Sequence, residues 1–298
     1  MIASFTEHRP LLFGIAYRML GSVAEADDMV QETWLRWQQQ DEAAVRSPKA
    51  WLVATITRLC IDQLRQARRT REDYYGVWLP EPLVESSSPP PHETAALADS
   101  LGMAFMLMLE SQSPVERAVF LLREVFDYEY ADIAVIIGKS EANCRQIVRR
   151  AKASLPRGPR PADTPPDARA REVVQRFLAA ARSGKVEELL AVLTDDATLY
   201  TDGGGKVTAA GRPIVSADRV SRFFAGIRRL ARNAPQTELA RINGGLGALV
   251  IDDGRLDRTM IFELHGNRIA AIYVVRNPDK LRHVAWPTAG TDGTRMQS

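Results

Sequence analysis

Apolar residues recur at helical spacing in the first part of the chain. One set, spaced by three or four residues, is Ala26, Val30, Thr33 and Trp37. This spacing places side chains on one face of a helix, and Ser22 with Glu25 forms a capping box just before it, so a helix is predicted to begin at about Val23. A second helix is predicted from Ser47 and Pro48, a cap residue followed by proline at the first helical position. Its core-facing positions are Leu52, Ile56, Leu59 and Leu64.

Residues 113–155 show the same helical pattern, interrupted by a tight turn. Ser113 and Pro114 open one helix, YADIAVIIG forms a short second one, and EANCRQIVRRAKASL forms a third. The turn GKS joins the last two helices, and its Ser140 is placed to cap the helix that follows. Two helices joined by a short glycine-containing turn are typical of a helix-turn-helix, whose second helix enters the major groove of DNA.

The last part of the chain has a different pattern. It opens with helical spacing at Val173, Val174, Phe177 and Leu178. Short alternating or apolar stretches follow, among them LGALVID, RTMIFELH and RIAAIYVVR, and the turns DDG and HGN separate them. This succession predicts an α+β domain with a meandering antiparallel sheet.

Two proline-rich stretches, GVWLPEPLVESSSPPPHE and PRGPRPADTPP, interrupt these patterns. Proline removes a backbone donor and blocks helix formation, so each stretch predicts an extended linker. The predicted divisions are a helical domain at 1–75, a linker at 76–100, a helix-turn-helix domain at 101–157, a linker at 158–167, an α+β domain at 168–284 and a flexible tail at 285–298.

The composition limits what the chain can be. Of its 298 residues, 39 are Lys or Arg and 37 are Asp or Glu, a formal net charge of +2. A nucleic-acid site must therefore be local rather than spread over the whole chain. Cys60 and Cys144 are the two cysteines, so neither a disulfide-stapled secreted domain nor a cysteine zinc site is predicted, and no cofactor is expected. The N-terminus lacks a signal pattern and the apolar runs are too short to span a bilayer, so we expect a cytoplasmic protein.

The first predicted helix carries an acidic face. Glu25, Asp28 and Glu32 repeat every three or four residues, away from the apolar face. Like charges at this spacing repel, so the face costs stability unless a cationic partner meets it. The alternative to a binding surface is a solvated face, favoured near the helix N-terminus by the helix dipole.

The second predicted helix carries a basic stretch. Between residues 54 and 71 a single acidic residue, Asp62, accompanies the arginines Arg58, Arg65, Arg68, Arg69 and Arg71. Such a stretch can follow the phosphates of a nucleic acid. The alternative is a solvent-facing surface with an internal pair between Arg58 and Asp62.

The third helix of the 113–155 stretch concentrates the positive charge of the chain. Seven basic residues and one acidic residue lie between Lys139 and Arg160. The pattern directs Cys144, Ile147, Val148, Ala151 and Leu155 inward. It leaves outside a set of side chains that suits base edges and phosphates, namely Asn143, Arg145, Gln146, Arg149, Arg150 and Lys152. The alternative is a basic amphipathic helix without a ligand.

Together these stretches resemble a known family. GSVAEADDMVQETWLRW, SPKAWLVATITRLCIDQLRQARR and SPVERAVFLLREVFDYEYADIAVIIGKSEANCRQIVRRAKASL, in that order, resemble the extracytoplasmic-function sigma factors, which keep only sigma regions two and four. WLPEP in the first linker, with DGGGK and NPDKL further on, resembles the SigJ-type group, which carries a SnoaL-like domain of the NTF2-like fold. The resemblance implies a multidomain chain with two all-α domains, a region-two helical bundle and a region-four helix-turn-helix, followed by an α+β cone.

The resemblance also implies partners and their sites. The partners are core RNA polymerase, through its β′ clamp and β flap, and promoter DNA; no membrane contact is implied, and a monomer is expected in the free state. The residues that would bind the β′ clamp are Asp27, Asp28, Gln31 and Glu32. Those that would bind the minus-ten element are Arg58, Arg65, Arg68 and Arg69, although Thr57-Arg58 stands where many members have Arg-Asn. Those that would bind the minus-thirty-five element are Ser140, Asn143, Arg145, Gln146, Arg149, Arg150 and Lys152.

For the third domain the resemblance implies regulation in cis. The implied regulatory residues are Trp78, Leu79, Pro80, Glu81 and Pro82 in the linker, Asp202, Gly203, Gly204, Gly205 and Lys206 in DGGGK, and Asn277, Pro278, Asp279 and Lys280 in NPDKL. In the family interpretation, the Trp-Leu pair contacts the triple-glycine loop. Two alternatives stay open: the pair packs on its adjoining helix, and Asn277-Pro278 only caps a terminal helix.

An enzymatic third domain would need an acid or base directed into its pocket. The candidates are His265, Asp202, Asp257 and Tyr273, but His265 lies in a predicted hairpin turn and Asp202 in a predicted glycine turn. No motif specifies a catalytic pair, so the chain is predicted not to be an enzyme. The alternatives to a sigma factor are a ligand-sensing one-component helix-turn-helix regulator and a pocket enzyme with a DNA-binding accessory. A small-molecule ligand of the third domain is left open.

Overall fold

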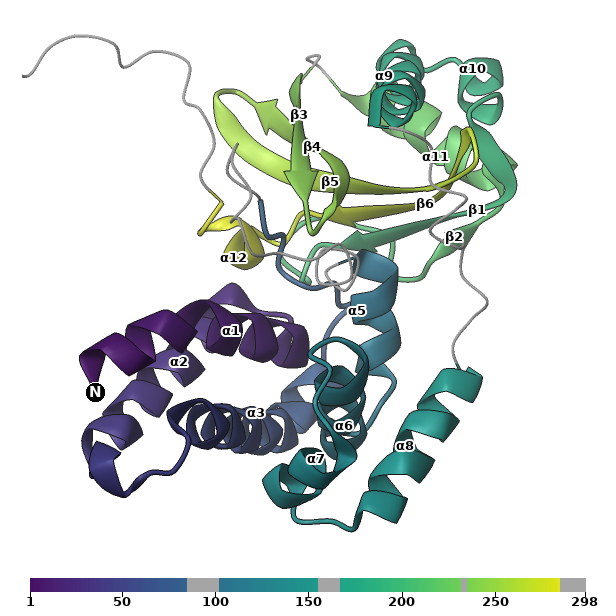
Figure 1. Cartoon of the computed structure of the whole chain (residues 1–298). Helices are drawn as coiled ribbons and strands as arrows, with labels where there is room; N and C mark the ends of the chain where they lie inside the picture. Colours follow the sequence, from purple (N-terminus) through teal and green to yellow (C-terminus); the bar gives the residue numbers. More distant parts are fainter. Residues whose placement is uncertain (85–101, 155–166, 232–234, 285–298) are drawn as a thin grey trace, which may run out of the picture. The chain divides into compact units, whose positions relative to one another are not determined.

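The computed structural model describes residues 1–84, 102–154, 167–231 and 235–284 (Figure 1). Within these ranges, the side chains of residues 68–72, 154 and 167 are not described. The described residues form two compact units. The first contains residues 1–81 and 102–154, and the second contains residues 82–84 and the residues from 167 onward. Most of the second predicted linker and the predicted tail lie outside the described residues.

The first unit is helical throughout its described elements. These are α1 (Ile2–Leu20), α2 (Val23–Gln38), a 3₁₀ helix (Glu42–Ala44), α3 (Pro48–Glu72), α5 (Met103–Glu110), α6 (Pro114–Glu124), α7 (Tyr130–Ile137) and α8 (Glu141–Ser154). The predicted helix starts at Val23 and Pro48 are confirmed. Ser22 accepts a hydrogen bond from the backbone of Glu25, as the capping pattern indicates.

The helices α1, α2 and α3 bury one shared core. The four predicted positions of α2, Ala26, Val30, Thr33 and Trp37, are its buried residues. On α3, Leu52, Ile56 and Leu64 are buried, and Leu59 is partly buried. Burial of each large apolar side chain contributes about 1.5–3 kcal/mol, so this apolar pattern stabilises the packed bundle more than helix propensity does.

The helices α6, α7 and α8 form the second helical group of the first unit. Ser113 and Glu116 complete a reciprocal capping box at the start of α6. Gly138 ends α7 with a φ of 70°, a left-handed conformation that glycine adopts without strain. The buried residues of α8 include four of the five predicted ones, Cys144, Ile147, Val148 and Ala151; Leu155 lies outside the described residues.

Arg117 on α6 joins the two helical groups. Its guanidinium donates to the carbonyls of Leu109 and Met19 and pairs with Glu110, with donor–acceptor distances of 2.9, 2.5 and 2.7 Å. The residue is only 3% exposed. A charge that is buried must be paired and hydrogen-bonded, so these contacts make Arg117 a fixed connection between the end of α1 and the helices α5 and α6.

The second unit combines helices with one sheet. Its elements are α9 (Asp167–Ser183), α10 (Val186–Leu190), β1 (Leu193–Asp202), β2 (Ile214–Val215), α11 (Ala217–Leu230), β3 (Gln236–Ile242), β4 (Gly245–Asp252), β5 (Arg255–His265), β6 (Arg268–Val275) and α12 (Pro278–Leu281). The strand order is β2-β1-β6-β5-β4-β3, so the predicted α+β class is confirmed.

The prediction of an antiparallel meander is right for β3 to β6 and wrong for β1. Strand β1 pairs with β6 in parallel, with Leu199 opposite Ile272. Between these two strands the described chain passes through α11 and four further strands, β2 to β5. The local apolar pattern carries no information on which distant strand lies beside β1, so its direction could not be derived from that pattern.

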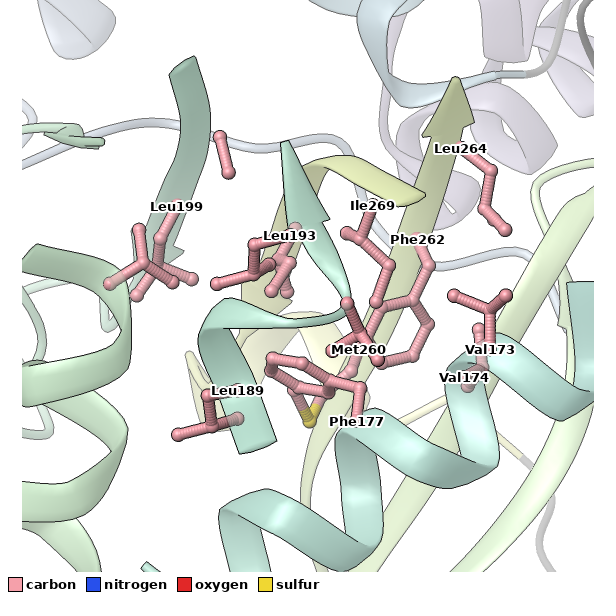
Figure 2. Packing of buried hydrophobic residues seen from close by; sticks show 14 of the residues in the cluster. Val173, Val174, Phe177, Leu189, Leu193, Leu199, Met260, Phe262, Leu264 and Ile269 are labelled. Atoms are coloured by element: carbon pink, nitrogen blue, oxygen red, sulfur yellow. The ribbon is translucent and has the colours of Figure 1, made fainter. Parts of the chain in front are cut away.

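The core of the second unit lies between the sheet and the helices α9, α10 and α11. Val174 and Phe177 on α9 and Leu189 on α10 point toward Met260 and Phe262 of the sheet (Figure 2). The rings of Phe177 and Phe262 meet edge to face, with centroids 5.5 Å apart. No described helix of either unit is long and apolar enough to cross a membrane.

Candidate functional site

The residues that the resemblance assigns to the β′ clamp lie on the solvent side of α2, whereas Glu25 of the predicted acidic face is half-buried and accepts a hydrogen bond from Gln63 at 3.1 Å. Asp27, Asp28 and Gln31 are exposed and Glu32 is partly exposed. Asp27 pairs with Arg9 at 3.1 Å and Glu32 pairs with Arg36 at 2.8 Å. Asp28 and Gln31 have no partner among the described residues. Ion pairs between exposed groups are weak, so a cationic partner can displace them at little cost.

A groove of about 410 Å³ with a mixed polar and apolar lining, which includes Arg9, adjoins this face between α1 and α2. Asp27 and Gln31 line it together with Phe5, Val30 and Trp34. The sequence pattern assigned Val30 to the core and gave no signal for the groove, because its other wall comes from α1. The surface therefore offers carboxylates and an apolar contact side by side, a combination that suits a partner helix with basic and apolar residues.

The arginines predicted to bind the minus-ten element have different partners in the structure. Arg65 is exposed and pairs with Asp62 at 3.0 Å, rather than leaving Asp62 to Arg58. Arg58 donates instead to the carbonyls of Ile136 and Val135, the last turn of α7, at 2.9 and 3.1 Å. The side chains of Arg68 and Arg69 lie outside the described residues. The contact of Arg58 with α7 was not predicted, because nothing local in the sequence links α3 to α7.

The outward face of α8 presents the residues predicted to bind the minus-thirty-five element. Ser140 caps the helix by accepting a hydrogen bond from the backbone of Asn143. The exposed side chains are Asn143, Arg145, Gln146, Arg149, Arg150 and Lys152. Arg145, Arg150 and Lys152 pair with Glu141, Glu116 and Glu124 at 2.6, 3.5 and 2.6 Å, whereas Gln146 and Arg149 have no partner among the described residues.

The segment Trp78–Glu81 packs on the junction of α1 and α2, within the first unit. Leu79 is fully buried there. The ring of Trp78 lies so close to Gly21 that a Cβ added to Gly21 would stand 2.5 Å from it. Tyr17 donates its hydroxyl hydrogen bond to the Glu81 carbonyl at 2.6 Å. Within the first unit, these contacts are therefore with the α1–α2 junction and not with α3, the helix that precedes the Trp-Leu pair in the sequence.

Glu81 completes the N-terminus of α2. Its carboxylate accepts hydrogen bonds from the Ser22 hydroxyl at 2.9 Å and from the Val23 backbone at 2.7 Å. A carboxylate at this position binds unpaired backbone donors and interacts favourably with the helix dipole. Glu81 lies 58 residues after Val23, so no capping rule based on nearby residues could identify it.

The residues that follow belong to the second unit. Leu83 donates its backbone N–H to the Asn243 side chain at 3.0 Å, and Val84 forms an antiparallel bridge with Ile242 at the end of β3. The carbonyl of Pro82 lies 2.9 Å from Nε2 of His283. The chain therefore changes from one unit to the other between Glu81 and Pro82.

The DGGGK and NPDKL motifs meet within the second unit. Lys280 donates to Asp202 at 2.8 Å, and both side chains are buried. Lys206 pairs with Asp279, which holds the pKa of that carboxyl below its usual value. Asn277 packs on Gly204, where an added Cβ would collide with it, and its side chain caps α12. The sequence named all of these residues but did not pair the two motifs with each other.

Each candidate catalytic group of the second unit has a structural role or an exposed position. Asp257 pairs with Arg258 and Arg276, and Tyr273 donates to Glu263 at 2.8 Å. Burial, followed by the charge of Glu263, raises the pKa of Tyr273. His265 is exposed at the end of β5, as the predicted turn implied. Among the described residues, no group of three or more His, Cys, Asp or Glu could hold a metal ion.

Comparison with known proteins gives matches over both helical groups and over the whole chain. Family models for Sigma-70 region 2 and Sigma-70 region 4 match residues 5–70 and 102–155. The ECF RNA polymerase sigma factor SigJ of Mycobacterium tuberculosis H37Rv is 34% identical, with 94% of this chain and 92% of that protein covered. The probable ECF RNA polymerase sigma factor SigI of the same organism is 29% identical, with 94% of each chain covered. The crystal structure of M. tuberculosis SigJ matches with a TM-score of 0.76 and 33% identity, over 94% of this chain and 98% of that one.

Proposed function

Because this chain belongs to the extracytoplasmic-function sigma factors, which bind core RNA polymerase and promoter DNA to initiate transcription and are not enzymes, we propose that its α+β domain regulates this activity in cis. The first helical group (α1–α3) is its region two, and the group α6–α8 belongs to its region four. We also infer a cytoplasmic location, because the sigma factors that it resembles act on RNA polymerase there.

The observation that carries the regulatory proposal is the course of residues 78–84. Trp78–Glu81 are anchored on region two, and Pro82–Val84 are anchored on the α+β domain. The two anchors are consecutive in the sequence. Because no flexible linker separates the two anchors, a displacement of either anchor is transmitted to the other through the backbone.

The anchor on region two acts on the helix that would bind the polymerase. Glu81 caps α2, and the residues Asp27, Asp28, Gln31 and Glu32, which we assign to the β′ clamp, lie on the same helix. Loss of the cap would destabilise the first turn of α2, next to these carboxylates. The α+β domain can thus change polymerase affinity by holding or releasing residues 78–81.

We assign promoter binding to two exposed surfaces, the α3 arginines and the outward face of α8. In the described conformation Arg58, Arg65 and Arg149 are all exposed, and Arg58 also donates to the carbonyls at the end of α7 through its Nε and Nη2. A guanidinium has five N–H donors, so the donors of Arg58 that the α7 carbonyls do not use can bind a phosphate.

Reconstituted transcription with core polymerase tests the regulatory proposal. We compare the full-length protein, Trp78→Ala and a chain ended at Leu155. Removal of the Trp78 ring should free residues 78–81 and change promoter output in the same direction as removal of the α+β domain, by severalfold. Tyr75→Ala is the matched control, because Tyr75 is an aromatic residue of the same segment that is 73% exposed. Equal output from all four proteins would show that the α+β domain does not regulate the factor.

A further inference from the structure

A cavity of about 490 Å³ lies inside the α+β domain, between α9, α11 and the sheet. Most of its wall is apolar and includes Leu178, Phe223, Phe224, Ile227, Met260 and Val274. A concave apolar site of this volume with a few polar groups is the usual form of a small-molecule site. The cavity is large enough for an organic ligand rather than for a single water molecule.

The charged residues that line the cavity all have the same sign. Among the described residues the lining contains no aspartate or glutamate and five arginines, Arg182, Arg222, Arg228, Arg258 and Arg276. Arg222 is bound to Asp218, and Arg228 is bound to the carbonyls of Arg182 and Ala231. The cavity therefore favours an anion over a cation or a neutral ligand.

Arg258 and Arg276 share a single carboxylate. Asp257 accepts a hydrogen bond from Nη1 of Arg258 at 2.5 Å and from Nη2 of Arg276 at 2.8 Å. Both guanidiniums thus meet Asp257 beside an apolar wall. Burial is the largest influence on the pKa of Arg258 and lowers it, and the charge of Arg276 lowers it further, against the opposing effects of Asp257 and Asp252, whose charges raise it.

Arg276 also retains an unused donor. Its Nη1 donates to the carbonyl of Thr208 at 3.0 Å and its Nη2 donates to Asp257. Its buried Nε–H has no hydrogen-bond partner among the described residues. The Arg276 side chain lines the cavity and is 29% exposed, so the Nη donors that Thr208 and Asp257 leave unused can meet a ligand oxygen. A carboxylate suits this position, because hydrogen bonds between a guanidinium and a carboxylate are charge-assisted and strong.

We propose that this cavity binds an amphipathic organic anion, a compound with an apolar body and one carboxylate, through Arg276 and Arg258. The apolar body occupies the space between Phe223, Phe224 and Met260. The ligand is bound rather than transformed, because none of the four candidate catalytic groups lines the cavity. The proposal does not depend on the regulatory role of the α+β domain.

Calorimetric titration of the full-length protein tests the proposal with three probes that share one alkyl chain. They are dodecanoate, its neutral methyl ester and dodecyltrimethylammonium, each below its micelle concentration. Dodecanoate should bind with one-to-one stoichiometry and about tenfold or more tighter than the ester, as a charge-assisted hydrogen bond predicts. The ammonium probe should not bind.

Two variants locate the site. Arg276→Gln should remove most of the preference for dodecanoate over the ester. Gly226→Phe should abolish binding of both, because Gly226 lines the cavity and a side chain added there meets no atom within 4 Å, so the ring can fill the cavity without disturbing the fold. Arg255→Gln is the control: Arg255 is exposed on β5 and does not line the cavity, so binding should be unchanged.

Three outcomes would overturn the proposal. The first is absence of one-to-one binding of dodecanoate. The second is equal affinity for dodecanoate and its ester. The third is unchanged dodecanoate binding by Gly226→Phe when circular dichroism shows that the variant is folded, since the anion would then bind elsewhere.

Discussion

Asp202 organises two loops of the α+β domain at once. One carboxylate oxygen accepts a hydrogen bond from the backbone of Gly204 at 3.0 Å, and the other accepts from Lys280 at 2.8 Å. Its carbonyl accepts from the backbones of Arg276 and Asn277. The turn role of Asp202 could be predicted, because aspartate before glycine commonly forms such turns. Its buried partner could not, because Lys280 lies 78 residues further along the chain.

At this scale we predict a large cost for removing Lys280. The Asp202 and Lys280 side chains are 0% and 8% exposed, so Lys280→Met leaves a buried carboxylate without its counter-charge. The expected loss is about 3–5 kcal/mol of unfolding free energy, measured by urea denaturation of the full-length protein. Lys206→Met removes the solvent-exposed pair with Asp279 and should cost at most about 1 kcal/mol. Similar losses from both variants would contradict a structural role for the buried pair.

The start of α2 shows how an element depends on distant residues. Ser22 caps the helix locally, as its sequence predicts. Glu81 supplies a second cap, and the Trp78 ring covers Gly21, whose φ of 68° closes α1. The junction between α1 and α2 therefore needs glycine at position 21 for two reasons. The backbone there is left-handed, and the Trp78 ring leaves no room for a Cβ.

We predict that Gly21→Ala releases residues 76–81 from region two. Alanine at this φ is strained by about 1–2 kcal/mol, and its Cβ would also collide with the Trp78 ring. Gly138→Ala is a matched control, because Gly138 has a φ of 70° but no atom within 4 Å of an added Cβ. Hydrogen exchange at residues 76–81, followed by mass spectrometry, should become faster only in Gly21→Ala. Equal acceleration of hydrogen exchange in both variants would mean that backbone strain alone, and not the collision with Trp78, causes the effect.

At the scale of the whole molecule, the described conformation of the first unit holds region two and region four together. Arg58 binds the last turn of α7, and Arg117 binds the carbonyl of Met19 in the last turn of α1. Arg18 adds a cation–π contact with Phe126, at 5.6 Å from the ring centroid. These contacts connect region two to region four within the first unit.

We predict that Arg58→Ala loosens this arrangement. Spin labels on cysteines introduced at the exposed positions Gln39 and Ala142 should show a broader distance distribution than in the unsubstituted protein. The native thiols, Cys60 and Cys144, are buried and burial raises the pKa of both, so they should label slowly. Arg65→Ala, on the same helix but with Asp62 as its one ion-pair partner among the described residues, should leave the distribution unchanged. An unchanged distribution in Arg58→Ala would show that its hydrogen bonds do not hold the two regions together.

Local patterns were sufficient for much of this protein. The spacing of Ala26, Val30, Thr33 and Trp37, the caps Ser22 and Ser140, and the glycine that ends α7 specify helices through contacts within a few residues. The residues assigned to the polymerase and DNA surfaces followed from exposed charge on those helices and from the family resemblance.

The tertiary structure alone decided which distant groups meet. The parallel pairing of β1 with β6, the cap from Glu81, the contact of Arg58 with α7 and the pair of arginines in the cavity all join residues far apart in the sequence. Helix periodicity and capping are local properties that neighbouring residues impose through backbone geometry. Burial of a charge or choice of a strand partner depends instead on which surfaces the packed core brings together.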